Sequence, residues 1–137
     1  MVHALKQVHR LLQPRGRLID VHNLPVPHRI EIHSPGSAIK AGWLLDRDDF
    51  ASERLALNAI TQAVSEGLFF LEDERDFDFN LYSENVAELQ KWLADGWKSA
   101  VIPEITLQRL EEMLAQASQP PRIVLKVQTR MICLSIA

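Results

Sequence analysis

The chain has 137 residues, of which 47% are hydrophobic and 24% charged, and its formal net charge at pH 7 is −3. This length accommodates one domain with a real core, in the proportions of an ordinary globular protein. A pI near 5.9 without a basic stripe argues against a nucleic-acid partner, and no stretch approaches the ~20 apolar residues that cross a bilayer.

The first predicted element is an amphipathic helix. Leu5, Val8 and Leu12 recur at intervals of three and four residues, with polar residues between them. Pro14 and Gly16 end this helix, because proline blocks its continuation and glycine permits a positive φ in a tight reversal.

Extended segments and turns follow the first helix. Residues 17–21 are a short apolar run, which predicts a buried strand. Residues 23–28 predict a loop because they contain two prolines. Apolar and polar residues alternate over 29–33, which predicts a brief edge strand, and the Ser-Pro-Gly sequence at 34–36 predicts another turn.

A long helix and a long extended segment make up the middle of the chain. Residues 48–66 carry apolar side chains on one face, and Gly67 ends this helix. Over residues 68–82 most apolar residues share one parity and the acidic residues the other. This pattern predicts a strand with a solvated acidic face that guards an edge against aggregation.

The last third of the chain predicts two helices and a strand. Ser83 is the expected cap of a helix over 84–95, and Pro103 suits the first turn of the next helix. Residues 122–136 close the chain as a strand with apolar residues on both faces after Met131, which places it inside a sheet.

These elements predict a single domain over residues 1–137 with an α/β or α+β layer fold and about four helices. We expect one shared core. Its predicted members are Leu5, Val8, Leu12, Leu18, Ile19, Leu57, Ile60, Phe77, Phe79, Leu89, Leu110, Ile123, Leu125 and Ile132.

Residues 4–23 resemble the segment that leads into the fifth strand of class I S-adenosylmethionine-dependent methyltransferases. In that family an amphipathic helix ends in an Arg-Leu-Leu-Lys-Pro-Gly-Gly type of turn, and a hydrophobic strand closing on an acidic residue follows. Here Arg15 stands where the family often has its first glycine. The later order is also similar: a long helix, a strand, and a final strand antiparallel between its neighbours. The resemblance implies a partial Rossmann-like sheet of the last three to four strands, with residues 84–117 as an insertion.

The methyl donor of that family lies over a glycine-rich loop in the amino-terminal half, which has no counterpart here. The five glycines are well separated, at Gly16, Gly36, Gly42, Gly67 and Gly96. We therefore expect no cofactor-binding residues in this chain, and S-adenosylmethionine only if an amino-terminal half completes the site.

His22 and Asn23 are the candidates for substrate-facing side chains, because ligands of open α/β sheets lie at the carboxyl ends of strands. The catalytic residues stay unassigned. All five histidines lie in the first quarter of the chain, near Asp20, but their spacing matches no helical pair or zinc-finger pattern. We therefore expect no metal site.

Three functions remain open for this sequence. The first is a methyltransferase-like domain that lacks its cofactor-binding half and has no catalysis of its own. The second is one half of a split methyltransferase that needs an amino-terminal partner. The third is a non-enzymatic binding or interaction module.

The sequence also predicts a partner and a location. If the fourth strand of the family fold is absent, residues 17–21 leave an apolar edge with unpaired backbone groups, which predicts a homodimer through residues 1–21. The single cysteine, Cys133, excludes an intramolecular disulfide and favours a reduced, cytoplasmic protein.

Overall fold

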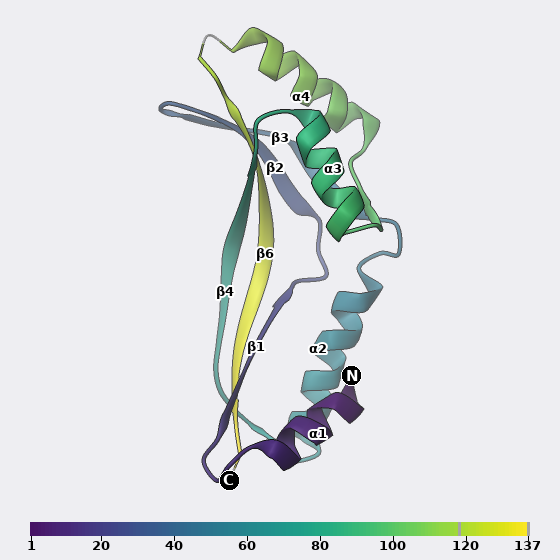
Figure 1. Cartoon of the computed structure of the whole chain (residues 1–137), viewed down its shortest axis with the longest axis vertical. Helices are drawn as coiled ribbons and strands as arrows, with labels where there is room; N and C mark the ends of the chain where they lie inside the picture. Colours follow the sequence, from purple (N-terminus) through teal and green to yellow (C-terminus); the bar gives the residue numbers. More distant parts are fainter. Residues whose placement is uncertain (118, 137) are drawn as a thin grey trace. The chain divides into compact units, whose positions relative to one another are not determined.

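The computed structural model describes residues 1–117 and 119–136, which form four helices and six strands (Figure 1). This is the mixed α/β arrangement expected from the sequence, with the expected number of helices. The elements are α1 (Val2–Leu11), β1 (Arg17–Asn23), β2 (His28–Ser34), β3 (Ser37–Asp46), α2 (Ala51–Ser65), β4 (Phe70–Ser83), α3 (Val86–Gly96), β5 (Ala100–Val101), α4 (Glu104–Gln116) and β6 (Arg122–Ser135). The sequence predicted a sheet of three to four strands, and β3 and β5 are the strands that it did not predict.

The strands form one sheet in which β6 has the most partners. β6 pairs antiparallel with β1 and with β2, and it also pairs with β4, so it lies inside the sheet as predicted. β2 and β3 form an antiparallel hairpin, and β5 pairs with the end of β3. The prediction of an edge strand over 29–33 is wrong, because β2 lies between β6 and β3 and its Ile30 and Ile32 are buried.

The chain divides into two compact units, which are described separately. Unit 1 consists of residues 1–25, residues 50–77 and the described residues from 128 onward. Unit 2 consists of residues 26–49 and 78–127. The long strands β4 and β6 therefore contribute residues to both units.

In unit 1 the helices α1 and α2 cover one face of β1 and β6 (Figure 1). Leu5 of α1 and Ile60 of α2 pack in one cluster with Ile132 and Leu134 of β6, and all four are buried. Leu18 of β1, opposite Leu134 in the strand register, packs against the same cluster. The apolar stripes predicted for both helices therefore face this part of the sheet.

Three residues predicted to be buried are exposed. Ile19 is 53% exposed, Phe77 42% and Phe79 54%. Alternation along a strand distinguishes two faces but does not say which face will be covered. In unit 1 the helices cover the face of Leu18, so its neighbour Ile19 lies on the open face.

In unit 2 the helices α3 and α4 pack with β2, β3 and β6. The core includes Ile30 of β2, Leu89 of α3, Leu110 of α4 and Leu125 of β6, each at most 1% exposed. The predicted core residues thus fall into two clusters instead of one. Four of them are only half-buried, namely Val8, Leu12, Leu18 and Leu57.

Local backbone geometry marks the ends of the helices. Gly67 ends α2 with a φ of +75°, in agreement with the sequence. Helix α2 begins later than expected because Phe50 has a φ of +55°. Helix α3 is capped by Asn85, whose side chain accepts a hydrogen bond from the backbone N–H of Glu88, and not by Ser83 as predicted.

The turn between α1 and β1 differs from the prediction in one residue. The positive φ expected at Gly16 is found at Arg15, with a value of +62°. Gly16 is required for another reason, since a Cβ there would lie 2.7 Å from the carbonyl oxygen of Gln13. The turn therefore contains one position that favours glycine for its conformation and one that lacks room for any side chain.

Candidate functional site

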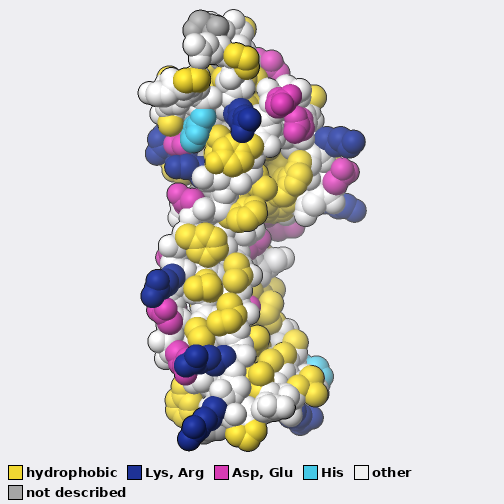
Figure 2. Space-filling view, turned by 60° about the vertical axis from the view of Figure 1, so that its left-hand side comes forward, with side chains coloured by type: hydrophobic (Ala, Val, Ile, Leu, Met, Phe, Trp, Pro, Cys, Tyr) yellow, Lys and Arg dark blue, Asp and Glu magenta, His cyan; other side chains and the backbone are white. Residues whose placement is uncertain are grey.

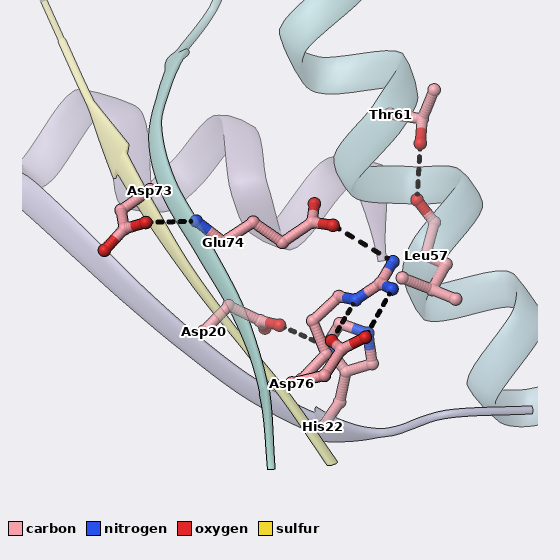
Figure 3. Close-up of polar contacts among 8 residues, drawn as sticks. Asp20, His22, Leu57, Thr61, Asp73, Glu74 and Asp76 are labelled. Carbon is pink, nitrogen blue, oxygen red and sulfur yellow. Dashed lines mark hydrogen bonds and ion pairs between the residues drawn. The ribbon is translucent and has the colours of Figure 1, made fainter. Parts of the chain in front are cut away.

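Asp20 and His22 form a hydrogen-bonded pair on β1 (Figure 3). Residues two apart on a strand project from the same face, so the pairing follows from their positions. The hydrogen bond joins Nδ1 of His22 to Oδ2 of Asp20, which leaves the Nε2 atom as the second polar atom of the ring. This Nε2 atom is buried and has no hydrogen-bond partner among the described residues.

The two predicted substrate-facing residues have different surroundings. His22 shares its face of β1 with Asp20, and its side chain is 12% exposed. Asn23 is adjacent in sequence, so strand alternation puts it on the opposite face, and its partner in the β1–β6 ladder is Thr129. The structure therefore brings only His22 together with another polar side chain of this candidate site.

Arg130 lies opposite His22 in the antiparallel register of β1 and β6. Its guanidinium donates two hydrogen bonds to the carboxylate of Asp76, of 2.7 and 3.0 Å, and lies 3.3 Å from Oε1 of Glu74 (Figure 3). The hydrogen bond from Arg130 holds the pKa of Asp76 below its usual value, and the same bond raises the pKa of Arg130. Three charged side chains from β4 and β6 are thereby held in one network.

A hollow of about 200 Å³ is lined by residues of α2, β4 and β6 within unit 1. Its apolar wall consists of Leu57, Ile60, Val64, Leu71 and Ile132, and its polar side chains are Thr61, Glu74 and Arg130. Pockets that hold cofactor-sized molecules have volumes of roughly 300–1,000 Å³. This hollow is therefore small for a nucleoside-containing cofactor.

In unit 2 a buried carboxylate, Glu31, is surrounded by three basic side chains. Glu31 is 4% exposed. Its oxygens lie 2.6 Å from Nε of Arg29, 2.9 Å from Nε2 of His33 and 3.5 Å from Nζ of Lys126. The pKa of Glu31 is lowered, and the hydrogen bond with His33 is the largest cause. Burial acts in the opposite direction, but the charges of Lys126 and Arg29 lower the pKa further. This cluster neutralises a charge within the sheet.

A second buried ionisable group in unit 2 is His28, at the start of β2. Its ring is fully buried and packs edge-on against Trp97, with 5.4 Å between the ring centroids. Burial lowers the pKa of His28 to about 4, although the charge of Asp78 acts in the opposite direction. The imidazole is therefore neutral at pH 7. Trp97 in turn donates its indole N–H to Asp46 at 3.0 Å.

The charged residues around the candidate site were not predicted from the sequence. Arg130 contacts Asp76, which is 54 positions away, so no local pattern connects them. Glu31 stands between two isoleucines in a segment predicted as an edge strand, so no local pattern indicates that its carboxylate is buried. A local signal did exist for Asp20, because a carboxylate and a histidine two positions apart on a strand share one face.

Known types of site and known proteins provide no further assignment. Among residues 1–117 and 119–136, no group of three or more His, Cys, Asp or Glu side chains is arranged to hold a metal ion. In the same residues no helix is long and apolar enough to span a membrane. No family model, no curated protein and no solved structure matches this chain.

Proposed function

We propose that this chain is the carboxyl-terminal half of a class I methyltransferase-like fold, without catalysis of its own. The observation that carries the proposal is the order of elements in unit 1. A helix, a strand, a long helix and a strand precede the last strand, β6, which pairs antiparallel with β1 and also pairs with β4. This is the arrangement that the resemblance of residues 4–23 implies.

The turn before β1 supports the same proposal. Arg15 stands where the family often has glycine, and its φ of +62° belongs to the conformation that favours glycine. The next position, Gly16, has no room for a side chain. A Pro-Gly-Gly sequence would satisfy both requirements, so the backbone at residues 14–16 fits the turn of that family.

The composition of unit 2 supports it as well. Unit 2 is made of two stretches of the chain. The first, residues 26–49, follows β1, and the second, residues 78–127, begins within β4 and ends within β6. The remaining segments of unit 1 then follow the order of the family without interruption by other elements. We infer that unit 2 is an addition to the methyltransferase-like half-sheet.

The residues present do not fit S-adenosylmethionine. The five glycines are spread over separate turns and elements, and the carboxylate of Asp20 at β1 is engaged by His22. The hollow in unit 1 is also small for this cofactor. We therefore assign no catalytic step to this chain alone, and we propose a cytoplasmic location on the basis of its single, reduced cysteine.

Calorimetric titration tests the proposed lack of a cofactor site. The isolated chain is expected to give no heat of binding with S-adenosylmethionine. One-to-one binding with a micromolar dissociation constant, about −8 kcal/mol, would contradict the proposal.

A chimaera tests the proposed relation to the family. The amino-terminal half of a class I methyltransferase, ending after its fourth strand, is joined to the front of this chain. We expect micromolar binding of S-adenosylmethionine and slowed hydrogen exchange of the β1 amides that face away from β6. Rapid exchange at these amides in a folded chimaera would show that β1 does not accept the fourth strand.

A second candidate function is a non-enzymatic interaction module. The observation that favours it is the open apolar face of β1, where Ile19 and Val21 are 53% and 55% exposed. Apolar surface of this kind marks contacts in soluble proteins more often than isolated exposed residues do.

A further inference from the structure

The face of unit 1 that α1 and α2 leave uncovered is apolar. Ile19 lies opposite Cys133 and Val21 opposite Met131 in the β1–β6 register, and directly opposed residues project from the same face. Asp76 contacts Arg130 on the helix-covered face, so the adjacent Phe77 of β4 projects onto the open one. We call Ile19, Val21, Phe77, Met131 and Cys133 the open face.

The open face draws its residues from three strands, and part of it is accessible. Ile19, Val21 and Phe77 are between 42% and 55% exposed, and Met131 and Cys133 are half-buried. Figure 2 shows hydrophobic side chains gathered on the side where β1 and β4 lie, with basic and acidic side chains beside them. Exposed apolar side chains gathered on one face are typical of a contact surface, and they match a partner that is itself apolar.

The charged residues at the border of the open face are balanced. Arg17 lies 2.8 Å from Glu72, and Arg75 lies 3.0 Å from Asp73, which leaves no net charge among the four. A nucleic acid or an anionic membrane would require an excess of basic residues. In a symmetric contact between two copies, by contrast, each cation can face a carboxylate of the other copy, and no like charges need to meet.

We propose that the open face is an interface on which a second copy of this chain docks in an isologous contact. The proposal does not depend on the methyltransferase-like assignment. It retains the homodimer expected from the sequence, and it places the contact on the exposed side chains of β1, β4 and β6.

Light scattering on the full chain tests the proposal directly. At tens of micromolar we expect a mass of about 31 kDa, twice the 15.6 kDa of one chain. The variants I19K and F77K should each return the mass to that of one chain, because a buried lysine without a partner opposes association. L55K is the matched control: Leu55 is 66% exposed on α2, away from the open face, and its variant should keep the dimer.

Cys133 provides an independent readout, because it is the only thiol in the chain and lies on the open face. Its rate of labelling by a maleimide should fall as the protein concentration rises, in proportion to the fraction of free chain. In I19K the labelling rate should be independent of concentration. Circular dichroism spectra that match the unmodified chain would show that the variants fold.

Three results would overturn the proposal. The first is a mass near 15.6 kDa for the unmodified chain at tens of micromolar. The second is a dimer that persists in both I19K and F77K with unchanged labelling of Cys133, which would place the contact elsewhere. The third is a mass that grows without limit, which would indicate a head-to-tail contact instead of an isologous one.

Discussion

The two units differ in the face of the sheet that lies away from each unit's own core. In unit 2 the face away from the core carries Glu31, surrounded by Arg29, His33 and Lys126, and the intervening Val124 is fully buried. In unit 1 the face away from its own helices is the apolar open face. Glu31 and Val124 are thus shielded from water in unit 2, whereas Ile19 and Val21 of the open face in unit 1 are more than half exposed. Both faces belong to antiparallel ladders of β6, so backbone pairing does not distinguish them. The difference in exposure comes from the side chains.

The largest expected effect compares a core residue of unit 2 with an open-face residue of unit 1. Leu125→Ala should lower the free energy of unfolding by about 2–5 kcal/mol, because Leu125 is fully buried and its loss leaves a cavity. Ile19→Ala should cost less than about 1 kcal/mol at concentrations where the chain is monomeric. Urea unfolding measures both, and equal costs would remove the distinction between the two faces.

The next effect concerns the buried imidazole of unit 2. Because the folded pKa of His28 is about 4 and its ordinary value is 6.5, the unfolded chain takes up a proton between these values and the folded chain does not. Stability should therefore fall by up to about 3 kcal/mol as the pH drops from 6.5 to 4.

The variant His28→Leu should lose this part of the pH dependence, and His3→Gln, at an exposed position of α1, should keep it. Denaturant unfolding at several pH values gives the comparison. Identical pH profiles for His28→Leu and the unmodified chain would mean that His28 is protonated equally in both states.

A smaller effect compares the two carboxylates that hold basic side chains in the two units. Glu31→Gln should cost about 1–3 kcal/mol, because it removes the charge that the buried cluster of unit 2 surrounds. Asp76→Asn should cost less than about 1 kcal/mol, because the Asp76 side chain is 51% exposed and its ion pair is screened by water. The stability that Glu31 supplies should disappear as the pH falls through its lowered pKa. A larger cost for Asp76→Asn would reverse the contrast.

The smallest effect concerns a turn in each unit. Arg15→Gly should stabilise the chain by about 0.5–1 kcal/mol, because it removes the strain of a left-handed arginine in unit 1. Gly36→Ala should destabilise it by a similar amount, since Gly36 has a φ of +73° in the β2–β3 turn of unit 2. Thermal unfolding resolves shifts of this size, and a destabilised Arg15→Gly variant would show that the Arg15 side chain makes a contact worth more than the strain.

The sequence predicted the helices better than the sheet because helix signals are local. Pro14, Gly67 and Pro103 stand beside the helix ends that they mark. Strand β3 was missed, because Gly42 and the mixed polarity around it resemble a loop until α4 is known to cover it. A Cβ on Gly42 would lie 2.2 Å from the Thr106 hydroxyl oxygen, so this glycine permits the close approach of helix and strand.

The candidate site was predictable only in part, for a related reason. His22 could be chosen from its place at the end of a strand, and Asp20 from the two-residue period. Arg130 and Asp76 meet only through the pairing of β4 with β6, which depends on the whole sheet. The same dependence explains why Ile19 was expected to be buried: the covered face of β1 is decided by helices distant in sequence.

The position of β6 in the chain has a consequence for biosynthesis. β1, β2 and β4 all pair with β6, and every one of them is synthesised before it. Neither unit can therefore close its sheet until residues 122–135 have left the ribosome. Pairings between segments so distant in sequence form slowly. During that interval β1 and β4 have edges without a partner strand, and their apolar side chains are exposed. We therefore expect chaperones to bind the nascent chain.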